Sequence, residues 1–294
     1  MPGPEHGSNA ALALLRACRP RQWAKNVLVV AAPAAAGMLF HPRIAAEVVG
    51  AFVVMSMVSS ATYLLNDVRD VEQDRRHPRK RFRPIAAGEL QVRTALIWAS
   101  ALAVGGVLIG ALIAPALGGV ALVYMLLTGA YSIWLKHIPF VDVAAIAAGF
   151  VLRALAGGAA TDLHLSRWFV LVTGFGAIFL VVGKRYAELA RDGDGASVRA
   201  TLGVYTLRGL RIAFNTAALL TFASYCGWAV TRLDHRAIYI ISALPLGLWL
   251  GRYTALVRRG EGEAPEDVVL RDRSLILLGA LWAVLCGAGI YVGV

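Results

Sequence analysis

The sequence predicts an all-α, polytopic membrane protein with nine transmembrane helices, and composition is the first reason. Of its 294 residues, 58% are hydrophobic and only 16% are charged, whereas soluble globular domains carry about 25% charged residues. The second reason is that long uncharged runs alternate with short charged loops. Because a helix needs about 20 apolar residues to cross a bilayer, each run is long enough to be considered as a span.

Nine such runs predict the spans in chain order: 24–40, 44–65, 94–114, 117–135, 142–160, 168–183, 212–231, 237–251 and 274–294. The uncharged stretch between residues 94 and 135 is twice the length of one crossing. Pro115 and Gly118 divide it into two helices joined by a tight turn. The first and eighth runs are short and contain Pro33 and Pro245. An odd number of spans places the two termini on opposite sides of the membrane.

The distribution of basic residues predicts the orientation. The chain has 29 Lys and Arg residues against 18 Asp and Glu. Arg153 falls within a span, and only Arg43, Arg167, Arg232 and Arg236 fall on the side opposite the N-terminus. Basic loops face the cytoplasm, so we expect a multi-pass plasma-membrane protein whose polar clusters and active site face the cytoplasm. No basic soluble domain is predicted, which argues against nucleic acid as a partner.

The first 18 residues lack a basic lead and a long apolar stretch. We therefore expect residues 1–18 to form a flexible cytoplasmic N-terminus rather than a cleaved signal peptide. The remainder contains neither repeats nor a soluble domain, so a single transmembrane domain is predicted for residues 1–294.

A group of carboxylates follows the second predicted span directly, in the stretch "NDVRDVEQD". Asn66, Asp70 and Asp74 are spaced i, i+4, i+8 and share a face if the helix continues, with Asp67 beside them. Like charges on one helix face repel, and a bound cation reverses that effect. Oxygen ligands of this kind suit Mg²⁺. We predict that Asn66, Asp70 and Asp74 are magnesium ligands; the alternative is a solvated helix end paired with nearby arginines.

Basic residues follow at once, namely Arg75, Arg76, Arg79, Lys80, Arg81 and Arg83, with His77 among them. Carboxylates that hold a metal ion, next to Arg and Lys side chains that bind phosphate oxygens, are typical of a metal–diphosphate site. We therefore expect Mg²⁺ to bridge the carboxylates and a diphosphate, with residues such as Arg76 as phosphate contacts.

Residues 66–88, "NDVRDVEQDRRHPRKRFRPIAAG", resemble the first Asp-rich motif of the UbiA-type intramembrane prenyltransferases, N-D-x-x-D-x-x-x-D followed by H-P-x-K-x-R-P and a Gly. The resemblance implies one UbiA-type transferase domain, a bundle of nine helices with a polar cavity that faces the cytoplasm. It also implies that the Asp-rich helix holds Mg²⁺ and the donor's diphosphate. The residues implicated as catalytic are Asn66, Asp67, Asp70 and Asp74, with Lys80 and Arg83 as phosphate contacts.

Three further stretches, "RPRQWAKN", "YSIWLKHIPFVD" and "GKRYAEL", resemble one group in this superfamily, the decaprenyl-phosphate phosphoribosyltransferases of actinobacterial cell-wall synthesis. The resemblance implies 5-phosphoribosyl 1-diphosphate as donor and polyprenyl (decaprenyl) phosphate as acceptor, in the synthesis of an arabinan precursor. The substrate-binding residues it implicates are Gln22, Lys25, Tyr131, Lys136, Asp142, Lys184, Arg185 and Glu188.

The chain departs from the aromatic prenyltransferases after the sixth predicted span. Those enzymes usually carry a second Asp-rich motif there, whereas Lys184 and Arg185 lead this region and Glu188 is its first acid. The added positive charge fits a donor with a 5-phosphate and an acceptor that is itself a phosphate. Lys184 and Glu188 are also spaced for a simple helix pair.

Two other functions stay open at this point: an aromatic prenyltransferase of a quinone or haem pathway, and a non-catalytic transporter of lipid phosphates. The oligomeric state is also open, with a homo-oligomer as one alternative.

Arg153 lies inside a predicted span, eleven residues beyond Asp142, or about 16 Å into the membrane. An Arg in mid-span costs roughly 2.5 kcal/mol or more on insertion scales. We therefore expect its side chain to face the bundle interior and an anionic group such as the lipid phosphate. The alternative is a structural role in hydrogen bonding.

Overall fold

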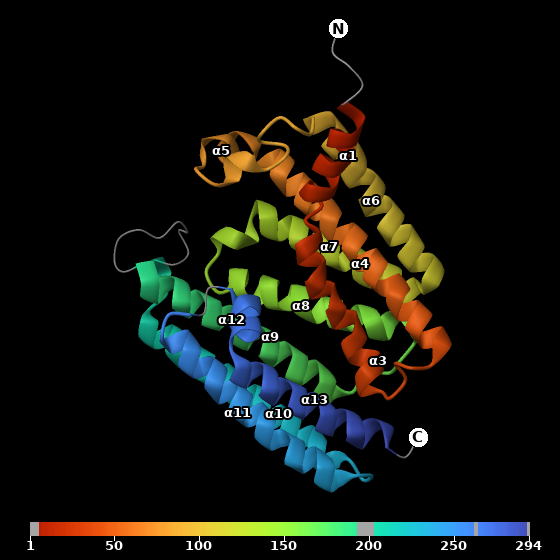
Figure 1. Cartoon of the computed structure of the whole chain (residues 1–294), viewed down its shortest axis with the longest axis vertical. Helices are drawn as coiled ribbons and strands as arrows, with labels where there is room; N and C mark the ends of the chain where they lie inside the picture. Colours follow the sequence, from red (N-terminus) through yellow and green to blue (C-terminus); the bar gives the residue numbers. More distant parts are fainter. Residues whose placement is uncertain (1–5, 193–202, 262–263, 293–294) are drawn as a thin grey trace. The chain divides into compact units, whose positions relative to one another are not determined.

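The computed structural model describes residues 6–192, 203–261 and 264–292, and this part of the chain is all-α, as predicted (Figure 1). The α-helices are α1 His6–Ala17, α2 Pro20–Trp23, α3 Ala31–Ala35, α4 Pro42–Arg69, α5 Val71–Arg76, α6 Val92–Ile113, α7 Pro115–Ile133, α8 Val141–Ala160, α9 Arg167–Asp192, α10 Leu207–Thr231, α11 Arg236–Arg258, α12 Pro265–Arg271 and α13 Arg273–Tyr291. Short 3-10 helices are η1 Ala24–Val30, η2 Lys80–Phe82 and η3 Leu135–His137.

Among the described residues, 7 helices are long and apolar enough to cross a membrane: α4, α6, α7, α8, α9, α11 and α13. The prediction of a multi-pass membrane protein is confirmed, but the predicted count of nine is not. Residues 24–40 form the short helices η1 and α3 instead of one long helix. The predicted span 212–231 lies within α10, which has 25 residues but contains several amide and hydroxyl side chains that lower its hydropathy.

Pro115 and Pro245 have different effects on the helices. Pro115 begins α7 after an extended residue, so α6 and α7 are separate helices, as predicted. Gly118 lies so close to α6 that an added Cβ would approach the Cβ of Ala111 to 2.8 Å. Pro245, by contrast, lies inside α11, which continues through it from Arg236 to Arg258.

The described chain divides into two compact units. Unit 1 comprises Met1–Pro33, Leu39–Ser132 and Leu152–Leu163, and unit 2 comprises Ala34–Met38, Ile133–Val151 and His164–Val294. The first half of α8 therefore belongs to unit 2 and its second half to unit 1.

Unit 1 is built around α4, which packs against α6 and η1. On α6, Ala95, Ala99 and Ala103 are buried at successive turns, since small residues let membrane helices approach closely. The expected flexible segment 1–18 differs from the structure: residues 6–17 form α1, and its Ala13 and Ala17 pack in a buried cluster. Residues 1–5 lie outside the described part of the chain.

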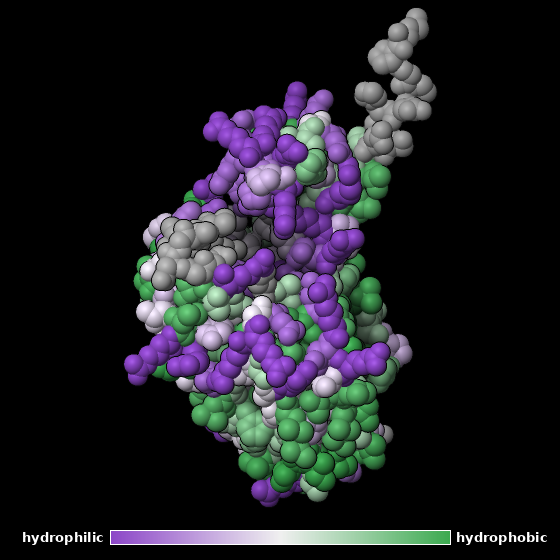
Figure 2. Space-filling view, turned by 60° about the vertical axis from the view of Figure 1, so that its left-hand side comes forward, coloured by the Kyte–Doolittle hydropathy of each residue, from purple (hydrophilic) through white to green (hydrophobic). Residues whose placement is uncertain are grey.

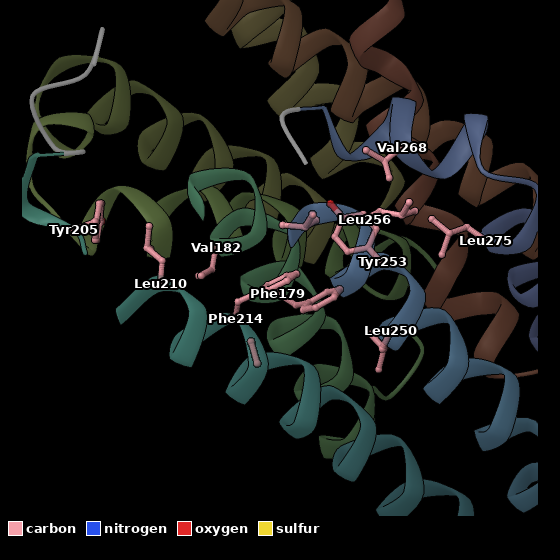
Figure 3. Packing of buried hydrophobic residues seen from close by; sticks show 12 residues of the cluster. Phe179, Val182, Tyr205, Leu210, Phe214, Leu250, Tyr253, Leu256, Val268 and Leu275 are labelled. Atoms are coloured by element: carbon pink, nitrogen blue, oxygen red, sulfur yellow. The ribbon is translucent and has the colours of Figure 1, made fainter. Parts of the chain in front are cut away.

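Unit 2 has an aromatic core between α9, α10 and α11, shown in Figure 3. The rings of Phe179 and Phe214 stack with centroids 4.6 Å apart, and Tyr253 packs beside both. An added Cβ on Gly183 would lie 2.7 Å from the ring of Phe214. Tyr205 and Leu210 continue this cluster at the beginning of α10.

The outer surfaces fit a membrane environment. In Figure 2, hydrophobic side chains cover a broad, continuous area of the face in view. Exposed apolar residues on α10, α11 and α13 include Leu219, Leu244 and Leu277.

Candidate functional site

The Asp-rich motif lies where α4 gives way to α5. Helix α4 ends at Arg69, Asp70 has φ −92° and ψ 8°, and α5 begins at Val71. Helical hydrogen bonds nevertheless continue across this interruption. The N–H of Asp70 donates to the carbonyl of Asn66 at 2.9 Å, and the N–H of Asp74 to the carbonyl of Asp70 at 2.8 Å. The predicted spacing of one turn between the three residues is therefore kept in the backbone.

Two of the four acidic-motif residues are engaged with arginines. The Oδ1 of Asp67 accepts hydrogen bonds from Arg19 at 2.6 Å and from Arg83 at 3.0 Å. Arg83 also donates to the Oδ2 of Asp74 at 2.6 Å. The side chains of Asp67 and Asp74 are each 2% exposed. These two carboxylates therefore pair with arginines, as in the alternative to metal binding considered from the sequence. Arg83, which was predicted to contact phosphate, binds both carboxylates in this structure.

Asn66 and Asp70 present the opposite environment. Both are partly exposed, and neither side chain makes a hydrogen bond or ion pair within the described residues. The two residues lie one helical turn apart along the backbone, a spacing that lets two side chains reach one cation. Asn66 and Asp70 therefore fit a magnesium ion, which takes one or two protein carboxylates and completes its shell with water and phosphate oxygens.

The described residues contain no cluster of three or more His, Cys, Asp or Glu side chains that could hold a metal ion. The predicted third ligand, Asp74, faces Arg83 and would have to exchange that partner to reach a metal. Asn66 and Asp70 are the two predicted ligands that have no competing partner among the described contacts.

The basic loop after α5 is shaped by His77, to which the sequence assigned no role. Its Nδ1 accepts hydrogen bonds from the backbone N–H groups of Arg79 and Lys80, each at 3.2 Å. This holds the turn into η2 and the backbone of Lys80. Lys80 is partly exposed, Arg76 is exposed, and neither forms an ion pair within the described residues. Both are therefore open to a phosphate group.

Arg19 is a further site residue that sequence reasoning missed. It has φ 56° and ψ 62°, a left-handed conformation that costs free energy in a residue other than glycine. Its guanidinium lies 5.1 Å from the ring centroid of Tyr63 and pairs with Asp67. Gln22 and Lys25, predicted as substrate contacts, follow in α2 and η1 and are partly buried.

Arg153 is buried within unit 1, at 6% exposure. Its Nε donates to the Oδ1 of Asn26 at 2.8 Å, and an Nη donates to the Tyr124 hydroxyl. Asn26 in turn donates to the hydroxyls of Ser56 and Ser59 at 3.1 and 3.4 Å. These contacts fit the alternative prediction, in which Arg153 has a structural role in hydrogen bonding. A contact between Arg153 and a lipid phosphate stays a prediction.

Unit 2 contains a second charge cluster. Arg185 lies between the Oδ2 of Asp142 at 3.1 Å and the Oε2 of Glu188 at 2.7 Å, and the Arg185 and Asp142 side chains are each 1% exposed. All three were predicted as substrate contacts. Glu188 pairs with Arg185, and no ion pair between Glu188 and Lys184 is present among the described residues. Lys184 is partly exposed.

Tyr205 joins this cluster and was not found from the sequence, because it lies in no motif and far along the chain from Asp142. Its hydroxyl donates to the Oδ1 of Asp142 at 2.7 Å and accepts the backbone N–H of Phe140 at 2.6 Å. Burial raises the pKa of Tyr205 to about 12; the Phe140 N–H opposes this rise and Asp142 reinforces it. The hydroxyl therefore keeps its proton and donates throughout the physiological pH range.

The remaining two predicted contacts fall in different units. Tyr131 is part of α7 in unit 1, and Lys136 is part of η3 in unit 2; both are partly exposed. Within unit 1 the structure brings together Asn66, Asp67, Asp70, Asp74 and Arg83. Within unit 2 it brings together Asp142, Arg185 and Glu188.

The model of the UbiA prenyltransferase family matches residues 27–290. A decaprenyl-phosphate phosphoribosyltransferase from Corynebacterium glutamicum is 43% identical, covering 97% of this chain and 88% of that protein. The protein of the same name from Mycobacterium tuberculosis is 41% identical, with 97% of each chain covered. A digeranylgeranylglyceryl phosphate synthase from Methanoculleus marisnigri is 30% identical over 80% of this chain and 74% of its own.

Solved structures agree in fold. A UbiA homolog from Archaeoglobus fulgidus bound to DMAPP and Mg²⁺ superposes with a TM-score of 0.69 at 17% identity, covering 96% of this chain and 99% of that one. The structure of a digeranylgeranylglyceryl phosphate synthase gives a TM-score of 0.70 at 13% identity, with 96% and 99% covered. The family match and the relatives together confirm the resemblance found in the Asp-rich motif: the chain belongs to the UbiA prenyltransferase family.

Proposed function

We propose that the chain is a pentosyltransferase that moves the 5-phosphoribosyl group from 5-phosphoribosyl 1-diphosphate to a polyprenyl phosphate, decaprenyl phosphate, and releases pyrophosphate. The observation that carries this proposal is the 40–43% identity to the relatives named decaprenyl-phosphate phosphoribosyltransferase, which extends over nearly the whole chain. The product would be a precursor for cell-wall arabinan.

The donor's diphosphate is assigned to the end of α4. Asn66 and Asp70 would hold Mg²⁺, which neutralises charge on the diphosphate as it leaves. Lys80 and Arg76 offer cationic groups without partners in the described structure to the remaining phosphate oxygens. Hydrogen bonds between a cation and phosphate are stronger than neutral ones, so these side chains stabilise the same charge.

Arg83 has a supporting role in this proposal. It joins the loop after α5 to Asp67 and Asp74 through short ion pairs. This fixes the loop that carries Lys80 against the end of α4, which carries Asn66 and Asp70. Preorganised charges cost no rearrangement at the moment of reaction.

Lys136 and Lys184 of unit 2 are proposed as further donor contacts. Both are partly exposed side chains with no ion pair in the described residues, and a phosphorylated donor requires cations. Lys184 lies where aromatic prenyltransferases usually carry acidic residues. This argues against an aromatic acceptor.

The reaction breaks the bond between C1 of the ribose and the diphosphate oxygen, and forms a bond between C1 and an oxygen of the lipid phosphate. The electron pair of the broken bond leaves with pyrophosphate. A phosphate is already ionised at neutral pH, so the chain need not supply a strong general base. An active site closed to water would protect the donor from hydrolysis.

The proposal also includes a topology of nine spans, two more than the seven apolar helices found among the described residues. The nine-span bundle would be completed by α10, which exposes apolar side chains such as Ile212 and Leu219, and by the segment of η1 and α3. A polar cavity would face the cytoplasm, where the soluble donor is made, and the protein would reside in the plasma membrane. A homo-oligomer is compatible with this arrangement.

The test is incubation of purified protein with ribose-labelled 5-phosphoribosyl diphosphate, decaprenyl phosphate and Mg²⁺. The expected result is a labelled lipid and one pyrophosphate per lipid. If the protein instead joins a prenyl diphosphate to an aromatic acid, it is an aromatic prenyltransferase. If it moves lipid phosphate across vesicles without forming any product, it is a transporter, and the proposal is wrong.

A further inference from the structure

We infer that Tyr205 is a positioning residue for donor binding. Its hydroxyl, which both donates and accepts a hydrogen bond, holds the segment that carries Lys136 in the conformation that binds the donor. The inference rests on the proposed function for the roles of Lys136 and Lys184, and it assigns a task to a residue that no motif contains. Tyr205 lies just before α10, at one end of the aromatic core of unit 2 (Figure 3).

The first observation is backbone strain at Phe140. This residue has φ 66°, a left-handed conformation in which a Cβ is unfavourable. Its ring is 67% exposed, so burial of the ring does not explain the conformation. The contacts described for it include the hydrogen bond from its N–H to the Tyr205 hydroxyl and the edge contact between the two rings, with centroids 5.1 Å apart.

The second observation is that the same hydroxyl donates to Asp142 at the beginning of α8. The carboxylate of Asp142 is shared between Tyr205 and Arg185, and Arg185 continues to Glu188 on α9. Tyr205 is 8% exposed, and Asp142 and Arg185 are each 1% exposed. The hydroxyl thus joins the residue just before α10 to Phe140 and Asp142 at the beginning of α8, and Asp142 in turn pairs with Arg185 of α9.

The two lysines proposed to bind phosphate are attached directly to these segments. Lys136 lies in η3, and backbone hydrogen bonds from Asp142 to Ile138 and from Ala144 to Phe140, each 3.0 Å long, join η3 to α8. Lys184 precedes Arg185 in α9. The contacts of Tyr205 with Phe140 and Asp142 therefore act on the junction between the Lys136 segment and α8.

Tyr205→Phe tests this, because it removes the hydroxyl and keeps the ring. We expect the donor KM to rise about tenfold, since misplaced binding groups lose contacts with substrate, while the KM for decaprenyl phosphate and the melting temperature change little. Tyr253→Phe is the matched control: this buried tyrosine belongs to the same core, and its hydroxyl has no hydrogen-bond partner in the described structure. It should leave all kinetic constants unchanged.

Two additional variants distinguish positioning from general stability. Adding Phe140→Gly to Tyr205→Phe should restore part of the donor affinity, because glycine adopts positive φ without strain; the double variant also serves if the single variant does not fold. In a Lys136→Ala background, Tyr205→Phe should raise the donor KM no further, because residues that act through one another are not additive.

Hydrogen exchange at the Phe140 amide provides a readout that needs no turnover. Faster exchange in Tyr205→Phe than in Tyr253→Phe is expected. If exchange is unchanged, or if Tyr205→Phe lowers kcat and the melting temperature without a selective rise in donor KM, the inference is wrong. If exchange rises as expected but the wild-type protein forms no labelled lipid, the proposed function fails while the tie made by Tyr205 stands.

Discussion

The arginines of the two charge clusters, Arg83 in unit 1 and Arg185 in unit 2, both bridge two acidic side chains but differ in access to solvent. The Arg83 side chain is 25% exposed, whereas that of Arg185 is 1% exposed. A ligand phosphate can therefore approach Arg83 at the rim of its cluster. Arg185 is enclosed, and its charge is used within the protein. Motif membership alone does not separate these two roles.

Ligands are expected at the partly exposed side chains next to each buried ion pair. In each cluster, buried ion pairs fix a helix end, and a neighbouring polar side chain stays open: Asn66 and Asp70 beside Asp67 and Asp74, and Lys184 beside Arg185. A buried charge without a partner is costly, so the enclosed residues must be paired before any substrate arrives. The partly exposed residues are solvated and need no partner within the protein, so a metal ion or phosphate could bind them.

The largest expected effect is on turnover. Asp70→Ala removes an open ligand whose side chain supports no described contact, so the fold should persist while kcat/KM falls at least about 1000-fold, or about 4 kcal/mol in the barrier. Steady-state kinetics with Mg²⁺, with and without EDTA, together with a melting curve, measure both quantities. Glu72→Ala, at an exposed residue paired only with Arg75 among the described contacts, is the control. Full activity of a folded Asp70→Ala protein would refute the metal assignment.

The second effect is on stability. Arg185→Ala leaves the buried carboxylate of Asp142 without its cationic partner, which costs roughly 3–5 kcal/mol. Arg83→Ala should cost less, because Arg19 still pairs with Asp67 and water reaches the rim of the cluster. Reversible unfolding in detergent compares the two variants. Equal losses would show that enclosure does not separate the clusters.

The third concerns Arg153, whose partners are neutral in the contacts described above. Arg153→Met keeps the length but leaves the Asn26 amide and the Tyr124 hydroxyl without a donor, and each such loss costs about 1–3 kcal/mol. Insertion into the membrane should be easier by roughly 2.5 kcal/mol or more. We therefore expect normal expression, reduced thermal stability and turnover lower by at least about tenfold. Unchanged turnover in the folded variant would make Arg153 purely structural.

The smallest effect is expected for Lys184. Lys184→Ala removes an open cation, so the donor KM should rise about tenfold, near 1.4 kcal/mol in binding, with no change in melting temperature. Arg191→Ala, on the same helix but nearer its exposed end, is the comparison for a general loss of positive charge. A donor KM that is the same in wild type and Lys184→Ala would reduce Lys184 to a topology signal.

Local sequence determined much of this protein. Long apolar runs predicted an all-α membrane fold, and Pro115 predicted the division between α6 and α7, because span length and proline geometry act within a few residues. The i, i+4 spacing of Asn66 and Asp70 predicted their shared position at the end of α4 for the same reason. The family resemblance also rested on a contiguous motif, and it proved correct.

Tertiary structure decided which side chains are enclosed. Asp74 pairs with Arg83, and Asp142 accepts a hydrogen bond from the Tyr205 hydroxyl. Arg19 pairs with Asp67, which lies far from it in the sequence. Residues 24–40 also form two short helices instead of one span, with η1 packed on α4. Such pairs join segments that are far apart in the sequence, so no local pattern predicts them. They form because a buried charge without a partner has a high desolvation cost. That requirement is met by the fold as a whole, so it could not be read from any one segment.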